Sequence, residues 1–450
     1  MTLSYCWGSG NSSARTTQAN VDARRDEIVF DELPRTIQDA ILVTRSLGER
    51  FLWVNAICII QPEDKDNTDW KFEAPEMSRY YQDSFCTIAA ARAADSAEGF
   101  LTERLQQRYP VGNCVLDTCN DPRRPGILCR AVLTTEPLPS WHHSVDRSPL
   151  TERGWVLQER LMSRRILFWT KHALFWSCPE MLASEFNHKG SEFEHSASKP
   201  VPVNFDKMLA GNDDHWSLST TWQLLVENYS TMEFTFESDR LVALMGISSR
   251  LQERFKDHFV FGLWRKYLLQ GLCWQRSSRL KDRADSNIAP SWSWIASKGE
   301  VKFPLKNAES ITWLLEIVDV DDDLDTLSFD RTQSECKLKV KGLLQNISFE
   351  GQVFKFDERK ALGTEDALST LLDRVDKVGD SSPITCLFLA SYVHSWDPDI
   401  KLLSYMMLEI VDKHDQKYQR IGFGITEYDS IDLFNVEKYT EEKRIVIELI

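Results

Sequence analysis

Two aromatic residues and two glycines follow the first apolar segment of the chain, in the stretch YCWGSG. Tyr5 and Trp7 could flank a planar ring, and Gly8 and Gly10 would let a phosphate approach the backbone closely. No Lys-Ser or Lys-Thr pair follows the glycines, so a phosphate loop of the GK[ST] type is excluded. The stretch predicts one wall of a nucleotide-sized pocket; alternatively, Tyr5 and Trp7 only close the end of a sheet.

A second group of polar residues lies in the stretch RGWVLQER. Arg153 could bind a pyrophosphate through two parallel hydrogen bonds, and Trp155, Gln158 and Glu159 are further candidate ligand contacts. Alternatively, Arg153 and Glu159 form a buried ion pair that holds this segment against the sheet. The neighbouring pair Arg164–Arg165 is typical of a solvated surface.

The composition argues against several classes of site and partner. The net charge of -15 argues against nucleic acid as a partner, because phosphate contacts need clustered Lys and Arg. Ten cysteines are scattered without a CxxC pair, which predicts no metal site and reduced thiols in a cytoplasmic protein. The sequence has no GxSxG or HExxH motif, no secretory leader and no apolar run long enough for a membrane span.

The elements that must position these residues alternate between strand and helix over residues 1–91. Apolar runs predict strands at 2–6, 51–60 and 85–91, and helical spacing predicts helices at 31–50 and 70–84. This alternation indicates a parallel sheet, whose ligands gather at the carboxyl ends of the strands. We therefore expect Tyr5–Gly8, the segment 60–64 and the loop after Ala91 to meet.

The rest of the chain predicts two further regions. A helix at RGWVLQER and a hairpin at 165–178 complete a first domain, residues 1–180. Helices at 238–255 and 261–274 lie in a mainly helical region, 181–287, and strands dominate 288–450. In the expected strand 289–296, Trp292 and Trp294 share one face and belong to the core. The fold class is α/β: a flavodoxin-like parallel sheet with insertions, then a helical and a β-rich region.

Four blocks of the sequence resemble the fungal heterokaryon-incompatibility (HET) domain in order and approximate spacing. They are LSYCWG, the stretch from LPRTIQ to AICIIQ, DWKFEAPEMSRYYQDS and RGWVLQERLMSRRILFW. DRLVALMGI, GLW and APSWSW also resemble the C-terminal halves of such proteins. The resemblance implies a role in allorecognition, the non-self recognition between hyphae, and in the programmed cell death that follows, a form of fungal innate immunity.

The HET domain is distantly similar to TIR domains, many of which cleave NAD+ at the nicotinamide bond with a helix glutamate shortly after a tryptophan. The matching residue is Glu73, three positions after Trp70, with Glu76 as second candidate; TIR enzymes commonly have W-x-x-x-E, one residue longer. This likeness implies NAD+ as candidate substrate, with no cofactor required. A carboxylate would stabilise the positive charge on the ribose, and the cationic nicotinamide needs no general acid to leave. Glu73 could instead be a solvent-facing helix residue.

Two departures from the family pattern leave alternatives open. The chain starts on the LSY block, where family members usually carry preceding residues. Asn55 stands where the family commonly has Asp, which would weaken any chemistry that needs this carboxylate. The candidates are an NAD+ glycohydrolase, a non-catalytic signalling module with a protein partner or self-association, and a decayed inactive copy. The enzyme hypothesis requires Tyr5, Trp7, Glu73 and Arg153 to converge.

Overall fold

The computed structural model describes residues 1–62, 67–102, 139–191, 218–277, 288–306, 308–320, 337–350, 353–356, 360–364, 384–393, 401–427 and 444–450. The chain divides into two compact units. The first comprises Met1–Trp70 and Tyr80–Ser196, and the second comprises Lys71–Arg79 and Ala197–Ile450.

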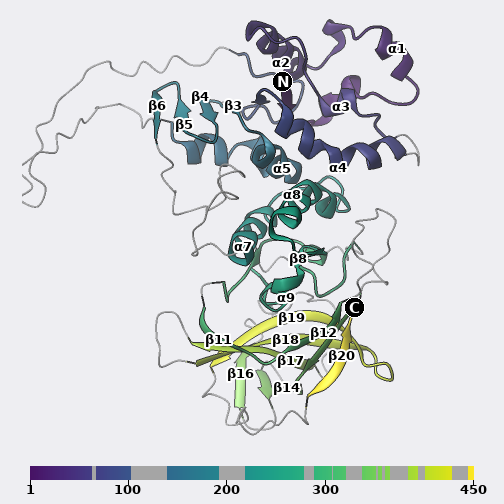
Figure 1. Ribbon diagram of the computed structural model, residues 1–450, viewed down its shortest axis with the longest axis vertical. Helices are drawn as coiled ribbons and strands as arrows, with labels where there is room; N and C mark the ends of the chain where they lie inside the picture. The colour runs from purple at the N-terminus through teal and green to yellow at the C-terminus, as the bar shows by residue number, and fades with distance from the viewer. Residues whose placement is uncertain are drawn as a thin grey trace, which may run out of the picture. The chain divides into compact units, whose positions relative to one another are not determined.

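The first unit is built on a mixed sheet, which among its described residues has six strands in the order β1-β2-β3-β4-β5-β6 (Figure 1). The first three strands are parallel, with Thr2 opposite Thr87 and Thr87 opposite Ile166. The later strands pair antiparallel, so the expected α/β sheet and its hairpin are confirmed. The strands are β1 (Thr2–Ser4), β2 (Thr87–Ala89), β3 (Ile166–Trp169), β4 (Leu174–Ser177), β5 (Leu182–Ser184) and β6 (Asn187–Ser191).

Helices cover this sheet because their apolar stripes match its buried face. Helix α2 begins after Pro34 and buries Ile37 and Ala40 in one core cluster with Leu3 and Ile88 of the strands. The helices of the unit are α1 (Val21–Asp26), α2 (Arg35–Ser46), α3 (Asn55–Cys58) and α5 (Gly154–Met162). Helix α4 (Thr68–Asp83) has its two ends in this unit, whereas its middle, Lys71–Arg79, is assigned to the second unit. Helices at 35–46 and 68–83 confirm the two crossover helices expected from sequence.

The expected strand at 51–60 is wrong. Trp53 makes an isolated parallel bridge to Thr2, and the chain then turns into the short helix α3. Thr16 explains the turn: its backbone N–H donates to the Ala56 carbonyl at 2.9 Å and its hydroxyl donates to the Ile57 carbonyl at 2.6 Å. These carbonyls are therefore unavailable to a strand ladder.

Four hydroxyl groups cross the sheet as a continuous row, which we call the hydroxyl row. Thr2 Oγ1 donates to Ser84 Oγ at 3.2 Å and lies 2.8 Å from Thr87 Oγ1. Thr87 Oγ1 lies 2.6 Å from Ser163 Oγ, which donates to the Glu159 carbonyl at 2.7 Å. The row ties β1 and β2 to the end of α5.

The second unit has a helical part whose core is formed by tryptophans. Trp222 and Trp294 both donate their indole N–H to the Gly262 carbonyl, each at 2.8 Å. Gly262 has φ 85, and a Cβ there would lie 2.7 Å from the Trp294 indole nitrogen, so only glycine fits between these rings. The helices are α7 (Leu218–Tyr229), α8 (Asp239–Phe255) and α9 (Leu268–Leu272), with short strands β7 (Phe259–Val260), β8 (Leu263–Trp264), β9 (Gln275–Arg276) and β10 (Val301–Lys302).

The β-rich region expected after residue 288 is confirmed as a ten-stranded sheet among the described residues. Strands β17, β18 and β19 are long neighbours in it (Figure 1). Buried Arg420 on β19 joins the sheet to the helical part, because its guanidinium donates to the Leu272 and Trp274 carbonyls. The strands are β11 (Glu309–Trp313), β12 (Glu316–Val320), β13 (Leu338–Gly342), β14 (Leu344–Glu350), β15 (Val353–Phe356), β16 (Lys360–Thr364), β17 (Ile384–Val393), β18 (Lys401–Asp412), β19 (Lys417–Glu427) and β20 (Ile445–Leu449).

Two elements expected in this unit differ from the structure. The helix expected at 261–274 is limited to α9, because Phe261 and Gly262 have φ 42 and 85 and form a turn instead. The strand expected at 289–296 is wrong: the segment forms turns and a 3-10 helix at Trp294–Ala296, which Ser293 caps by accepting from the Ile295 N–H. Trp292 and Trp294 are nevertheless fully buried, as expected for core residues.

Candidate functional site

The turn after β1 is held from two sides by side chains distant in sequence. The Arg153 guanidinium donates a hydrogen bond to the Tyr5 carbonyl, which connects the start of α5 to the end of β1. The Tyr5 hydroxyl donates to Asn11 Oδ1 at 2.8 Å. Burial raises the pKa of Tyr5 far above its usual range, so the phenol remains protonated as a donor. Tyr5 is therefore a fixed part of the framework around Arg153.

Glu159 places a carboxyl group in the interior behind this turn. The residue is 5% exposed, and the hydroxyls of Ser4 and Tyr81 are its hydrogen-bonding neighbours. Burial raises the pKa of Glu159, while the Ser4 hydroxyl, the Arg153 charge and the Tyr81 hydroxyl act in the opposite direction. Oε2 has no geometrically acceptable hydrogen bond within the described part of the chain. Glu159 is therefore a buried carboxyl group that interacts electrostatically with Arg153, and its contact with a ligand stays a prediction.

Trp7 and Asn55 form a pair beside the turn. The Trp7 indole N–H donates to Asn55 Oδ1 at 3.2 Å, and the Ala56 N–H donates to the same oxygen at 2.8 Å. The Asn55 carbonyl in turn accepts from the Gln61 side chain at 3.1 Å. An amide oxygen accepts these bonds as a carboxylate oxygen would, so the change from the usual Asp preserves the contact and removes only the charge.

The glycines of the opening turn surround an anion that the chain itself supplies. The Asp95 carboxylate accepts from the backbone N–H of Ser9 at 2.7 Å and of Gly10 at 3.2 Å, and from the Ala97 N–H at 2.9 Å. These bonds, led by the one from Ala97, lower the pKa of Asp95. A Cβ on Gly8 would lie 2.1 Å from Asp95 Oδ2, so the glycine is required by this contact. The close approach expected for a phosphate is made here by a carboxylate.

The loop after β2 that carries Asp95 is also tied to α2. The Asp39 carboxylate is buried and accepts from the backbone N–H of Phe100 at 2.7 Å and of Leu101 at 2.9 Å. The Thr36 hydroxyl accepts from the Gly99 N–H at 3.2 Å. The loop is thereby fixed against both the helix and the opening turn, as expected for segments that meet at the carboxyl ends of parallel strands.

Helix α4 presents an aromatic face. Trp70 meets Trp155 of α5 edge to face, with ring centroids 6.3 Å apart and an interplanar angle of 84°. At the other end of α4, Tyr81 donates to the Leu3 carbonyl at 3.1 Å. Glu73 follows Trp70 by three positions and therefore shares its face of the helix. Glu76 forms an ion pair with Arg79 at 2.9 Å on the surface of the helix.

The structure therefore brings the predicted site residues together in three groups. Tyr5, Arg153 and Glu159 form one group, Trp7 and Asn55 form a second, and Trp70 and Trp155 form a third. Gln158 is fully buried, Gly8 contacts Asp95, and Glu73 and Glu76 belong to the segment Lys71–Arg79 of the second unit, so their place among the groups stays a prediction.

Sequence reasoning missed four polar participants in these groups. Nothing in the sequence indicated that the Tyr81 hydroxyl on α4 would face the Glu159 carboxyl group. Ser4 sits at the end of an apolar strand, and Asn11 and Asp95 sit in polar loops without a motif. The alternative that Arg153 and Glu159 hold their segment in place agrees with the Arg153 bond to Tyr5.

Neither a metal site nor a membrane-spanning helix is found among the described residues. Within the described ranges, no group of three or more His, Cys, Asp and Glu side chains has the geometry of a metal site. Among the helices of those same ranges, none combines the length and the apolar character of a bilayer span.

Comparison with known families decides the identity of the first unit. Residues 1–159 match the family model described as Heterokaryon incompatibility protein (HET). Residues 1–159 therefore carry a HET domain. The match covers the turn after β1, Asp95, Arg153 and Glu159, so the groups described above all belong to the HET domain. No curated protein and no solved structure matches the chain.

Proposed function

We propose that this HET-domain protein acts in the cytoplasm in fungal non-self recognition, and that it causes cell death by cleaving NAD+ at the nicotinamide–ribose bond. The observation that carries the proposal is the group of polar and aromatic side chains around the carboxyl end of β1. In α/β sheets with parallel strands this edge is where nucleotide ligands bind. Arg153 reaches this edge from the start of α5, and Trp7 and Asn55 flank it from the turn after β1 and from α3.

The proposed reaction needs one carboxylate and water. The bond between ribose C1′ and the nicotinamide nitrogen breaks, and its electron pair goes to the nitrogen, which loses its positive charge. The ribose becomes an oxocarbenium-like cation, and water adds at C1′ and releases a proton to give ADP-ribose. The Glu73 carboxylate, on the Trp70 face of α4, stabilises the ribose cation. Arg153 supplies the positive charge for the pyrophosphate.

The test compares two isosteric variants in cells. The full-length protein, Glu73→Gln and Glu76→Gln are expressed at equal levels, and NAD+, nicotinamide and ADP-ribose are measured together with viability. We expect the wild type and Glu76→Gln to deplete NAD+ and Glu73→Gln to leave it intact, because only the charge at the catalytic carboxylate is lost. Equal depletion by the wild type and Glu73→Gln would show that Glu73 is not the catalytic group.

A non-catalytic signalling module is the second candidate, and one observation favours it. The backbone N–H groups of Ser9 and Gly10, which could bind a phosphate, already bind the Asp95 carboxylate. A turn filled by its own side chain leaves less room for a nucleotide. If wild-type expression kills cells while NAD+ stays constant, the module hypothesis is supported and the glycohydrolase is refuted.

A further inference from the structure

The amino ends of the parallel strands carry an exposed aromatic surface opposite the edge used by the candidate site. Thr2 pairs in parallel with both Trp53 and Thr87, and Thr87 pairs in parallel with Ile166. The residues two positions before Trp53, Thr87 and Ile166 therefore lie at the same height along the strand direction. Those residues are Phe51, Phe85 and Arg164. Phe51 is 79% exposed and Phe85 is 55% exposed, although phenylalanine is normally buried.

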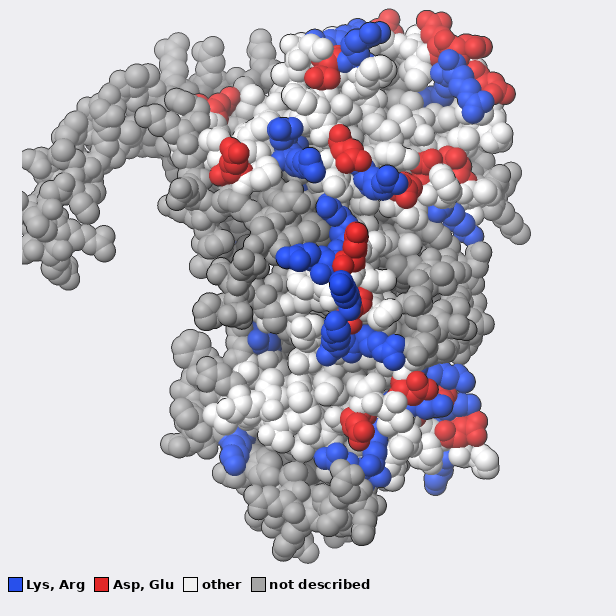
Figure 2. Space-filling view, viewed as in Figure 1, with Lys and Arg blue, Asp and Glu red and all other residues white. Residues whose placement is uncertain are grey.

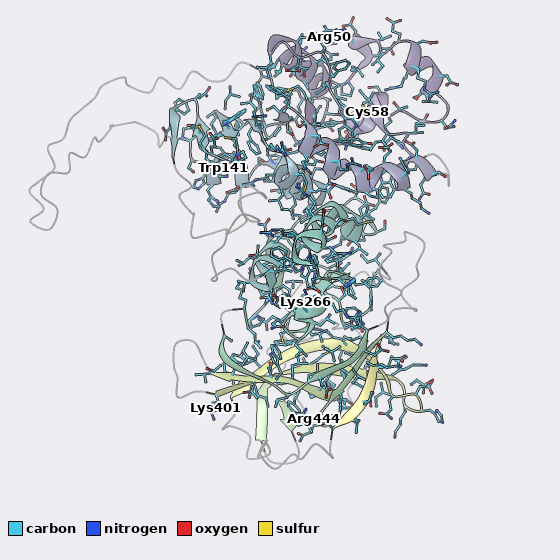
Figure 3. All side chains as sticks on the ribbon, in the orientation of Figure 1. Arg50, Cys58, Trp141, Lys266, Lys401 and Arg444 are labelled. Atoms are coloured by element: carbon cyan, nitrogen blue, oxygen red, sulfur yellow. The ribbon has the colours of Figure 1, made fainter. Side chains whose placement is uncertain are left out.

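Arginines accompany both rings. The Arg50 guanidinium carbon lies 5.9 Å from the centroid of the Phe51 ring, and that of Arg165 lies 5.7 Å from the Phe85 ring. Arg50 lies at the outer surface of the unit (Figure 3), and Arg164 and Arg165 are exposed. We call these five residues, Arg50, Phe51, Phe85, Arg164 and Arg165, the aromatic-basic edge. Such a surface fits a partner that offers both carboxylates and aliphatic side chains.

The same unit carries a segment with that chemistry. Residues 26–32, with the sequence DEIVFDE, contain four carboxylates and three apolar residues. Ile28 is 44% exposed and Val29 is 43% exposed, and both lie between exposed acidic residues, with Val29 in extended backbone. Acidic side chains gather over the end of the unit where α1 lies (Figure 2). We call this stretch the acidic-apolar segment.

We propose that the HET domain self-associates, with the aromatic-basic edge of one copy bound to the acidic-apolar segment of a second copy. The whole chain has a net charge of -15, so two copies repel each other overall and approach only where opposite charges face. The contact joins two different surfaces. It therefore builds open or closed assemblies of several copies unless both contacts form within one pair.

The test uses charge reversal and its complementation in the full-length protein. The double substitution Arg164→Glu with Arg165→Glu reverses the charge of the aromatic-basic edge. The double substitution Asp31→Lys with Glu32→Lys reverses the charge of the acidic-apolar segment at these two positions. Each double variant alone is expected to dissociate at protein concentrations at least about tenfold higher than the wild type, because like charges now face at the contact. An equimolar mixture of the two double variants should associate again, because each reversed surface meets a complementary one. Sedimentation velocity measures the proportions of monomers and larger assemblies in all samples.

The apolar part of the contact has its own variants. Phe51→Ser and Phe85→Ser should weaken association, whereas Phe236→Ser in the second unit, where Phe236 is 66% exposed, should leave it unchanged. Circular dichroism checks that each variant is folded. A wild type that stays monomeric at all concentrations, or a mixture that fails to reassociate, refutes the proposal. Binding of the edge to phosphatidylserine vesicles without self-association would assign it to a membrane surface and would also refute the proposal.

Discussion

Replacing Gly8 with alanine tests the account of the opening turn most directly. Gly8 has φ 57 and ψ -160, a conformation that an alanine rarely adopts. The new methyl group would also lie 2.1 Å from Asp95 Oδ2 and 2.8 Å from Asp95 Cβ, so the carboxylate must move away. The substitution therefore adds backbone strain and breaks the contact between β1 and the loop after β2.

The magnitude follows from these two parts. A backbone with φ 57 and ψ -160 lies in a region that is essentially restricted to glycine, and it costs an alanine ~1–2 kcal/mol. The displaced carboxylate loses its bonds from the N–H groups of Ser9 and Gly10, and each is worth about 0.5 kcal/mol at this largely exposed position. The expected loss of stability is about 2–3 kcal/mol for Gly8→Ala. Gly48→Ala is the matched control, because Gly48 has φ 80 and its added Cβ would meet nothing within 4 Å.

The assay is urea denaturation of the full-length protein, with hydrogen exchange of the peptide that covers residues 1–14 as local readout. We expect Gly8→Ala to lower the free energy of unfolding by about 1 kcal/mol more than Gly48→Ala does. Asp95→Ala should lower it by about 1–2 kcal/mol relative to the wild type. The double variant Gly8→Ala with Asp95→Ala should cost less than the sum, because both substitutions remove the same hydrogen bonds. If Gly8→Ala costs no more than Gly48→Ala, or the double variant is additive, the described contact does not stabilise the fold.

Three further outcomes are expected. Asp39→Ala should destabilise the HET domain by about 2–4 kcal/mol in urea, because it leaves two backbone N–H groups of the loop after β2 without their acceptor, while Asp31→Ala at the surface should change little. The pKa of Asp95 is lowered in the fold, so its contribution is complete above the unfolded pKa of about 4 and is lost as the pH falls through the folded value; Asp95→Ala should flatten this part of the acid-denaturation curve. Burial raises the pKa of the Cys6 thiol to about 11, so peptide mapping after alkylation at pH 8 should find exposed Cys58 modified well before Cys6.

The sequence predicted the framework of the HET domain better than its connections. The strands at β1, β2 and β3 and the helices α2 and α4 follow from apolar periodicity, which local side-chain burial imposes directly. The run 51–60 was misleading because its ten residues, all apolar except Asn55, have the length of a strand. Thr16 instead donates to the carbonyls of residues 56 and 57, where the chain forms a short helix. That contact spans about forty positions and leaves no periodic signal.

The candidate site was predictable in residue type but not in role. Aromatic and glycine residues after β1 correctly indicated a turn with close backbone approach. The approaching group is Asp95, 86 positions from Ser9, and no motif around it distinguishes it from other loop carboxylates. Glu159 likewise became a buried carboxyl only through Ser4 and Tyr81, which come from two other elements. Roles that depend on three distant segments cannot be derived from spacing along one chain.

The hydroxyl row across the sheet has too few protons for its bonds. Ser84 donates to the Tyr81 carbonyl, Thr2 donates to Ser84, and Ser163 donates to the Glu159 carbonyl. Three of the four hydroxyl protons are therefore used in bonds that do not involve Thr87. Thr87 keeps a single proton for two neighbouring oxygens and can satisfy one of them at a time. Two arrangements that differ by the rotation of one hydroxyl group are therefore open to the centre of the sheet, and Thr87→Val would remove one hydrogen bond rather than two.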